Sequence, residues 1–92
     1  MHKLSAEQIA LNINLLPQWK HEEGKLVKTF VKGNFKDAIA FVTVIAEIAE
    51  EQNHHPDIRI QYNKVTLYLT THDSQGVTGK DFLLAQRIES IE

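Results

Sequence analysis

Three histidines, His54, His55 and His72, lie at the ends of two short strand-like segments and could transfer protons. Imidazole suits this chemistry because its unperturbed pKa, about 6.5, lets one ring act as an acid and another as a base near neutral pH. Pro56 directly follows the histidine pair, where it keeps His55 out of helical geometry and ends any preceding helix. The backbone at the histidine pair is therefore conformationally restricted.

The residues between the histidines predict a β-hairpin. Apolar residues alternate with polar ones from 58 to 62 and from 65 to 69, which is typical of two half-buried strands. A two-residue turn at Asn63-Lys64 gives every apolar residue an apolar partner on one face. The same register places His55 opposite His72 on the other face, with Cβ atoms about 5 Å apart. We therefore expect the imidazoles to meet at the open end of this hairpin.

A histidine cluster of this kind admits three interpretations. It could be solvated or structural, because histidine is often only half-buried. It could bind a metal, but zinc sites usually contain thiolates or a His-x-x-x-His helical pair, and neighbours in an extended segment point to opposite sides. The third interpretation is acid-base catalysis. We expect no bound metal.

Four sequence motifs surround these histidines. They are Glu50-x-x-x-His54-His55-Pro56, Tyr62-Asn63-Lys64-Val65, Thr70-Thr71-His72-Asp73-x-x-Gly76-x-Thr78, and Asp81. Together they resemble the motifs of the pterin-4a-carbinolamine dehydratases. The resemblance extends over nearly the whole chain in the order of predicted elements, and over about the last half in its motifs.

The resemblance implies a reaction. These enzymes remove water from 4a-hydroxytetrahydropterin to give quinonoid dihydropterin, the recycling step of tetrahydrobiopterin after aromatic amino acid hydroxylation. The 4a-hydroxyl is protonated as it leaves, and a ring nitrogen loses its proton. Histidines suffice for such a reaction without a cofactor, and general acid-base catalysis typically contributes about 10² to 10⁴ in rate.

The resemblance also implies roles for individual residues. His54, His55 and His72 match the family's three catalytic histidines. We assign His54 and His72 to proton transfer and His55 chiefly to holding the pterin. Asn53 stands where the family often has Asp, and Asp73 where it often has Glu. Asp81 also fits a helix-capping carboxylate. The positions that match the lining of the pterin site or its edge are Glu50, Asn53, Pro56, Thr70, Thr71, Asp73 and Asp81.

A non-enzymatic interaction module is the alternative function. Relatives on the same fold serve as a dimerisation cofactor for a homeodomain transcription factor, or assist assembly of carbon-fixing enzymes after losing the histidine motif. All three histidines are present here, which favours the enzyme. The family forms dimers or tetramers, so we expect a homodimer or homotetramer.

Composition excludes several other classes of protein. Ninety-two residues make a single domain spanning 1–92, and a formal net charge of -2 offers no basic surface for direct nucleic acid binding. The chain has no cysteine, its first residues lack the apolar core of a signal peptide, and the apolar stretch 38–49 is too short to cross a bilayer. We expect a cytoplasmic protein that does not bind membranes.

The remaining pattern predicts the elements that position the histidines. Helical spacing and caps predict helices from about Ser5 to Leu15, from Asn34 to Glu51, and from Thr78 onward. Alternation between Trp19 and Lys32 predicts another hairpin, with its turn at Glu23-Gly24. The order helix, two strands, helix, two strands, helix predicts an α+β fold: a two-layer sandwich whose four-stranded antiparallel sheet carries three helices on one face.

Overall fold

A computed structural model describes residues 2–92, which form three α-helices, four strands and one short 3₁₀ helix. Each α-helix starts at a residue whose side chain accepts a hydrogen bond from the first turn: Ser5, Asn34 and Thr78. All three starts were predicted from the sequence. In chain order the elements are α1 (Ala6–Ile13), β1 (Lys20–Glu22), β2 (Lys25–Val31), α2 (Phe35–Gln52), β3 (Asp57–Gln61), β4 (Lys64–Leu69), η1 (His72–Ser74) and α3 (Gly79–Glu89).

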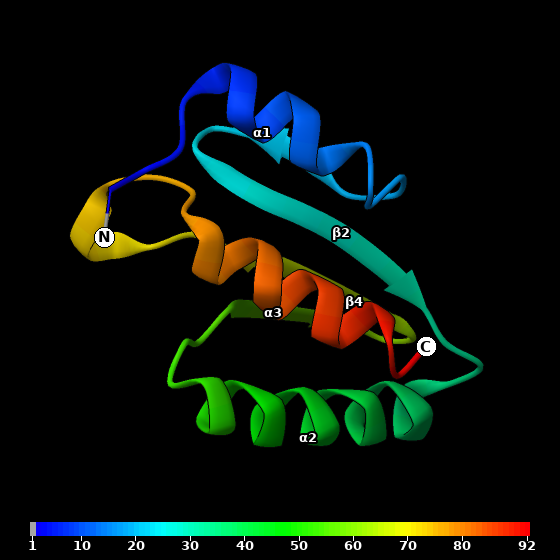
Figure 1. Cartoon of the computed structure of the whole chain (residues 1–92). Helices are drawn as coiled ribbons and strands as arrows, with labels where there is room; N and C mark the ends of the chain where they lie inside the picture. The colour runs from blue at the N-terminus through cyan, green and yellow to red at the C-terminus, as the bar shows by residue number, and fades with distance from the viewer. Residues whose placement is uncertain (1) are drawn as a thin grey trace.

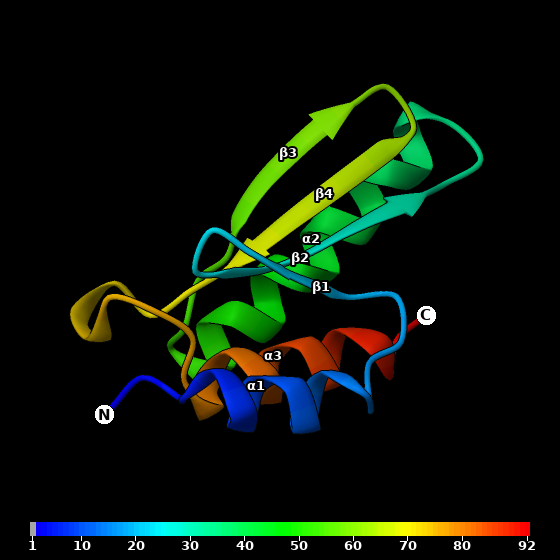
Figure 2. The ribbon, with the colours of Figure 1, turned by 90° about the horizontal axis from the view of Figure 1, so that it is seen from above.

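The four strands form one antiparallel sheet in the order β1-β2-β4-β3, and the helices pack on one of its faces (Figures 1 and 2). Every second residue of the two central strands is buried against the helices, as the alternating pattern predicts. The other face is open, and there Thr29 and Thr66 share a hydrogen bond across the β2–β4 pair. The core includes Leu26, Phe30, Ile45, Ile48, Val65, Leu67, Leu69, Leu84, Ala85 and Ile88. The predicted α+β sandwich is confirmed.

The first hairpin has the predicted turn. Glu23 and Gly24 both have positive φ, 49° and 76°. In a two-residue hairpin, this conformation gives the turn a twist that matches the twist of the two strands. Strand β1 then pairs with β2 from Lys20↔Val27 to Glu22↔Lys25.

The predicted register of the second hairpin is wrong by two residues. The turn is Tyr62-Asn63, not Asn63-Lys64, and the ladder runs from Gln61↔Lys64 to Asp57↔Tyr68. Asn63 is held in the turn by Lys32: the Lys32 N–H donates to the Asn63 carbonyl at 2.8 Å, and the Asn63 Nδ2 donates to the Lys32 carbonyl at 3.0 Å. Tyr62 takes the left-handed conformation, with φ 53°.

The predicted and observed registers bury the same side chains, because a shift of two residues keeps every side chain on the same side of the sheet. Ile58 now pairs with Leu67 and Ile60 with Val65. The two-residue shift does change which residues pair at the open end of the hairpin. His55 does not lie opposite His72, because β3 begins at Asp57 and His72 belongs to η1. The predicted pairing of His55 with His72 across the hairpin is therefore wrong.

No helix in the range 2–92 is long and apolar enough to cross a membrane.

Candidate active site

His54 is placed by the C-terminal end of α2. Asn53 takes the left-handed conformation that commonly ends a helix, with φ 50°, and the His54 N–H then donates to the Ala49 carbonyl at 3.0 Å. Asn tolerates this conformation better than most residues. The chain thus leaves the helix axis at Asn53, and Pro56 prevents it from resuming helical geometry.

A fully buried carboxylate holds the ring of His54. Asp81 Oδ1 contacts His54 Nε2 at 2.5 Å, while Asp81 Oδ2 accepts from the Thr78 N–H at 2.9 Å and from the Thr71 hydroxyl at 2.8 Å. The Thr78 contact is half of a capping box that starts α3. Asp81 therefore has both of the roles considered for it, as a helix cap and as a neighbour of the site.

We assign the hydrogen between His54 and Asp81 to Nε2, because a carboxylate accepts hydrogen bonds and Oδ2 of Asp81 already accepts two. The remaining nitrogen, Nδ1, is then left for a substrate. Thr71 gives its hydrogen to Asp81, so the hydroxyl of the fully buried Thr78 donates to Thr71 Oγ1 across 2.7 Å. Every side-chain oxygen of Asp81, Thr71 and Thr78 thus has a partner.

His72 and Asp73 come from η1, which lies in a tight loop after β4. The loop is closed by a bridge between Thr71 and Gly76, with the Thr71 N–H donating to the Gly76 carbonyl at 3.0 Å. The side chain of Lys3 covers Gly76, where an added Cβ would lie 3.2 Å from the Lys3 Cδ. The short loop thus carries His72 back toward the end of α2.

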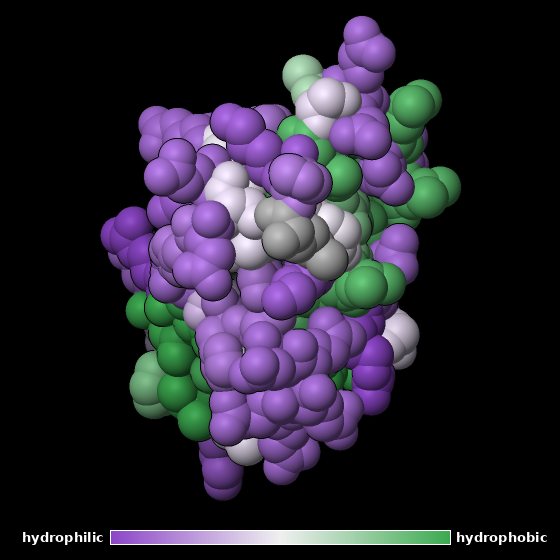
Figure 3. Space-filling view, turned by 60° about the vertical axis from the view of Figure 1, so that its left-hand side comes forward, coloured by the Kyte–Doolittle hydropathy of each residue, from purple (hydrophilic) through white to green (hydrophobic). Residues whose placement is uncertain are grey.

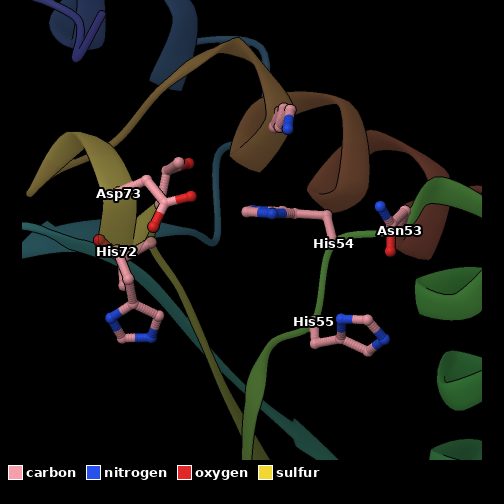
Figure 4. Close-up of a pocket in the computed structure, with 8 residues that line it drawn as sticks. Asn53, His54, His55, His72 and Asp73 are labelled. Carbon is pink, nitrogen blue, oxygen red and sulfur yellow. The ribbon is translucent and has the colours of Figure 1, made fainter. Parts of the chain in front are cut away.

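His55 turns to the other side of the chain from His54, as neighbours in an extended segment do. Its Nε2 contacts Glu50 Oε2 on the last turn of α2, and both side chains are exposed. In Figure 4 the His54 ring points toward Asp73, whereas the His55 ring points away from both. Glu50 therefore contacts a residue of the cavity lining without lining the cavity itself.

The three histidines line one cavity of about 330 Å³. This lies within the range of about 300 to 1,000 Å³ that is usual for small-molecule sites. The side of the molecule carrying η1 is mostly hydrophilic in Figure 3, which suits a polar ligand. The lining residues are Asn53, His54, His55, Thr70, Thr71, His72, Asp73 and Lys80 (Figure 4).

Seven of the ten residues named from the sequence line this cavity. Glu50, Pro56 and Asp81 do not: Glu50 lies behind His55, Pro56 follows it in the chain, and Asp81 lies beneath His54. Lys80 was missed. The capping-box pattern places residue 80 in the first turn of α3, directly before Asp81, but it does not predict that the side chain reaches the cavity. In the part of the chain that the structure describes, no three His, Asp or Glu side chains are placed to hold a metal ion.

Asp81→Asn tests whether the buried carboxylate positions His54. The amide can present an acceptor to His54 or to Thr78 and Thr71, but not to all three, so one buried donor loses its partner. We expect the free energy of unfolding to fall by about 1 to 3 kcal/mol. If the protein dehydrates a pterin, kcat should fall about 10- to 100-fold, part of what a correctly positioned acid-base group contributes, while KM changes little.

The matched control is Asp37→Asn, because Asp37 is an exposed aspartate in the first turn of α2. It should retain parental kinetics. Unchanged kcat in folded Asp81→Asn would show that Asp81 only caps α3.

The fold and the site together define a class of protein: a small α+β sandwich with a histidine-lined cavity at the open end of its second hairpin. Residues 2–91 match the family described as Pterin 4 alpha carbinolamine dehydratase. The chain belongs to this family.

Known relatives match the chain over almost its full length. It is 50% identical over 91 residues to a protein of Chloroflexus aurantiacus, and 43% identical over 90 residues to one of Sulfolobus acidocaldarius. Both are provisionally named pterin-4-alpha-carbinolamine dehydratase, and the alignments cover 99% and 98% of this chain and 98% and 99% of those proteins.

Solved structures have the same fold. A transcriptional coactivator/pterin dehydratase from Brucella melitensis superposes with a TM-score of 0.92 at 27% identity, covering 98% of each chain. A pterin dehydratase-like RuBisCO assembly factor of the alpha-carboxysome superposes with a TM-score of 0.65 at 22% identity, covering 79% of this chain and 84% of that one. At 22% identity, the similarity to the second structure is a similarity of fold alone.

Proposed function

We propose that this protein is a 4a-hydroxytetrahydrobiopterin dehydratase, which removes water from 4a-hydroxytetrahydropterin to give quinonoid dihydropterin. One observation carries the proposal: His54, His55 and His72 line a single cavity of suitable size, and a buried carboxylate orients His54. Family membership supports it. The reaction belongs to the recycling of tetrahydrobiopterin.

The proposed mechanism uses two imidazoles. His54 has Nε2 held by Asp81, so its Nδ1 takes the proton from the pterin ring nitrogen, and the carboxylate stabilises the imidazolium that forms. His72 protonates the 4a-hydroxyl, so that the carbon–oxygen bond breaks with release of water. The electron pair of the ring nitrogen forms the new carbon–nitrogen double bond. One proton is taken up and one is given, so the reaction needs no oxidant or reductant.

The other lining residues would recognise the pterin edges. Thr70 donates its hydroxyl hydrogen to the Gly24 carbonyl at 3.0 Å, and Thr71 donates its own to Asp81. Both hydroxyl oxygens can then only accept from a ligand, which suits the N–H and amino groups of a pterin. Asn53 and Asp73 add an amide and a carboxylate to the same wall.

His55→Ala should raise KM about tenfold and leave kcat within about threefold of the parent, because His55 is proposed to hold the pterin rather than to move a proton. Steady-state kinetics at several substrate concentrations would measure both constants. Glu50→Ala should show a smaller effect of the same kind, since it removes only the partner of His55. A fall in kcat with unchanged KM would contradict this assignment.

A direct assay tests the proposed function. Purified protein is added to freshly generated 4a-hydroxytetrahydropterin, and formation of quinonoid dihydropterin is followed against the uncatalysed reaction. A rate no higher than the uncatalysed one would leave the interaction-module alternative. Metal analysis of the same sample serves as a second test, because a stoichiometric ion would contradict metal-free proton transfer.

We also propose a cytoplasmic homodimer or homotetramer. In residues 2–92, β1 and β3 are the edges of the sheet, and each pairs with another strand on one side only. Open edges can pair between copies of a chain. Size-exclusion chromatography with light scattering would give the number of copies.

A further inference from the structure

A second cavity adjoins the candidate active site. It measures about 280 Å³ and is lined by Gln52, His54, Lys80 and Leu83. Two of these residues, His54 and Lys80, also line the first cavity. The two cavities therefore meet at His54 and Lys80, between the last residue of α2 and the outer side of α3.

The lining of the second cavity combines one cation with an apolar surface. Lys80 is exposed, and none of the four ion pairs found among residues 2–92 includes it. Leu83, which lies one turn further along α3, is 61% exposed. No carboxylate lines this cavity in the described structure, because Asp73 belongs to the first cavity and Asp81 is buried with its oxygens hydrogen-bonded.

The covalent structure of a pterin would let one ligand extend from the first cavity into the second. The ring nitrogen at position 5, bonded to the carbon that carries the departing hydroxyl, is also bonded to carbon 6, which carries the side chain. If His54 reacts at that nitrogen, the side chain leaves the ring close to His54. The second cavity begins at this point.

We infer that the second cavity binds the 6-substituent of the pterin and favours a substituent bearing a carboxylate or a phosphate over the uncharged one of tetrahydrobiopterin. The anion would lie against the Lys80 ammonium, and the carbon link to the ring would pack on Leu83. Lys80 is thus a specificity-determining residue. This inference rests on the proposed function, because it places the pterin ring in the first cavity.

Three stable, fluorescent ligands test the inference: 6-hydroxymethylpterin, its phosphate ester, and pterin-6-carboxylate. Their dissociation constants are measured by fluorescence titration at low salt. The parent should bind at least one anionic ligand about fivefold more tightly than the neutral one, the upper range for an exposed ion pair. Because salt screens exposed charges, this preference should shrink at high ionic strength.

Lys80→Gln should bring all three ligands to within twofold of one another. Lys36→Gln is the matched control, because Lys36 is also an exposed lysine at the second position of a helix, α2. It should keep the parental preference. Preference for only one of the two anionic ligands would identify the anion as phosphate or carboxylate.

Two results would overturn the inference while leaving the proposed function standing. One is equal binding of all three ligands by a protein that is active in the dehydratase assay. The other is an anion preference that persists in Lys80→Gln. A protein that binds none of the ligands and shows no dehydratase activity would overturn the proposed function, and this inference with it.

Discussion

Replacing His54 with alanine should lower kcat for pterin dehydration by about 10² to 10⁴, the contribution that a positioned acid-base group typically makes. His54 is the ring that Asp81 orients, and its side chain is only 11% exposed. The same change removes a partner of a buried carboxylate, so the free energy of unfolding should also fall by about 1 to 3 kcal/mol. Progress curves for quinonoid dihydropterin and urea denaturation would measure the two effects.

Two further variants separate chemistry from folding. His54→Gln keeps an N–H that can donate to Asp81 but has no group that takes up a proton near neutral pH. It should be as inactive as the alanine variant while regaining part of the lost stability. His21→Ala changes an exposed histidine of β1 that has no assigned role, and it should behave like the parent. Parental activity in folded His54→Gln would remove His54 from proton transfer.

His72→Ala should lower kcat by about 10² or more, because His72 is the proposed acid for the departing hydroxyl. Its effect on stability should differ from that of His54. His72 is exposed at the start of η1, so the free energy of unfolding should stay within about 0.5 kcal/mol of the parent. This pairing of a large kinetic effect with a small stability effect is the expected mark of a catalytic surface residue.

The double variant His54→Ala/His72→Ala sharpens this test. Groups that act in one step usually show losses that do not add. The double variant should therefore be little slower than the slower single variant. If His72→Ala dehydrates the pterin at the parental rate, the acid must be another group, and Lys80 is the remaining cationic side chain in the cavity lining.

Local patterns in the sequence predicted most of the fold. The Ser5–Gln8 capping box, the Asn34 cap and the Glu23-Gly24 turn each depend on residues close together in the chain, and all three are present. The alternation in β4 likewise predicted which side chains are buried. Such features can be predicted from the sequence because one short segment determines each of them.

The register of β3 against β4 could not be read in the same way. Registers that differ by two residues bury the same face, so apolar matching did not distinguish them. The contact that fixes the turn joins Asn63 to Lys32, which lie 31 residues apart. The predicted turn would place Lys64 at its second position, where glycine is usual, and this was a local sign against it.

The histidines share a cavity for a reason other than the predicted one. They are gathered by the left-handed end of α2 at Asn53, the capping carboxylate Asp81 and the loop that carries His72, rather than by direct pairing across the hairpin. Lys80 was missed because its place in the cavity depends on how α3 packs beside α2 and η1. Tertiary packing of this kind leaves no periodic signal in the sequence.

The central claim is that residues 54, 55 and 72 surround the place where a pterin binds. The most direct test of this claim is an NMR titration. The histidine rings are labelled with nitrogen-15, 6-hydroxymethylpterin is added, and the signals of all five histidines are followed. We predict that the ring signals of His54, His55 and His72 shift together with one dissociation constant, while those of His2 and His21 stay in place. Shifts confined to His21, or shared equally by all five rings, would contradict the account.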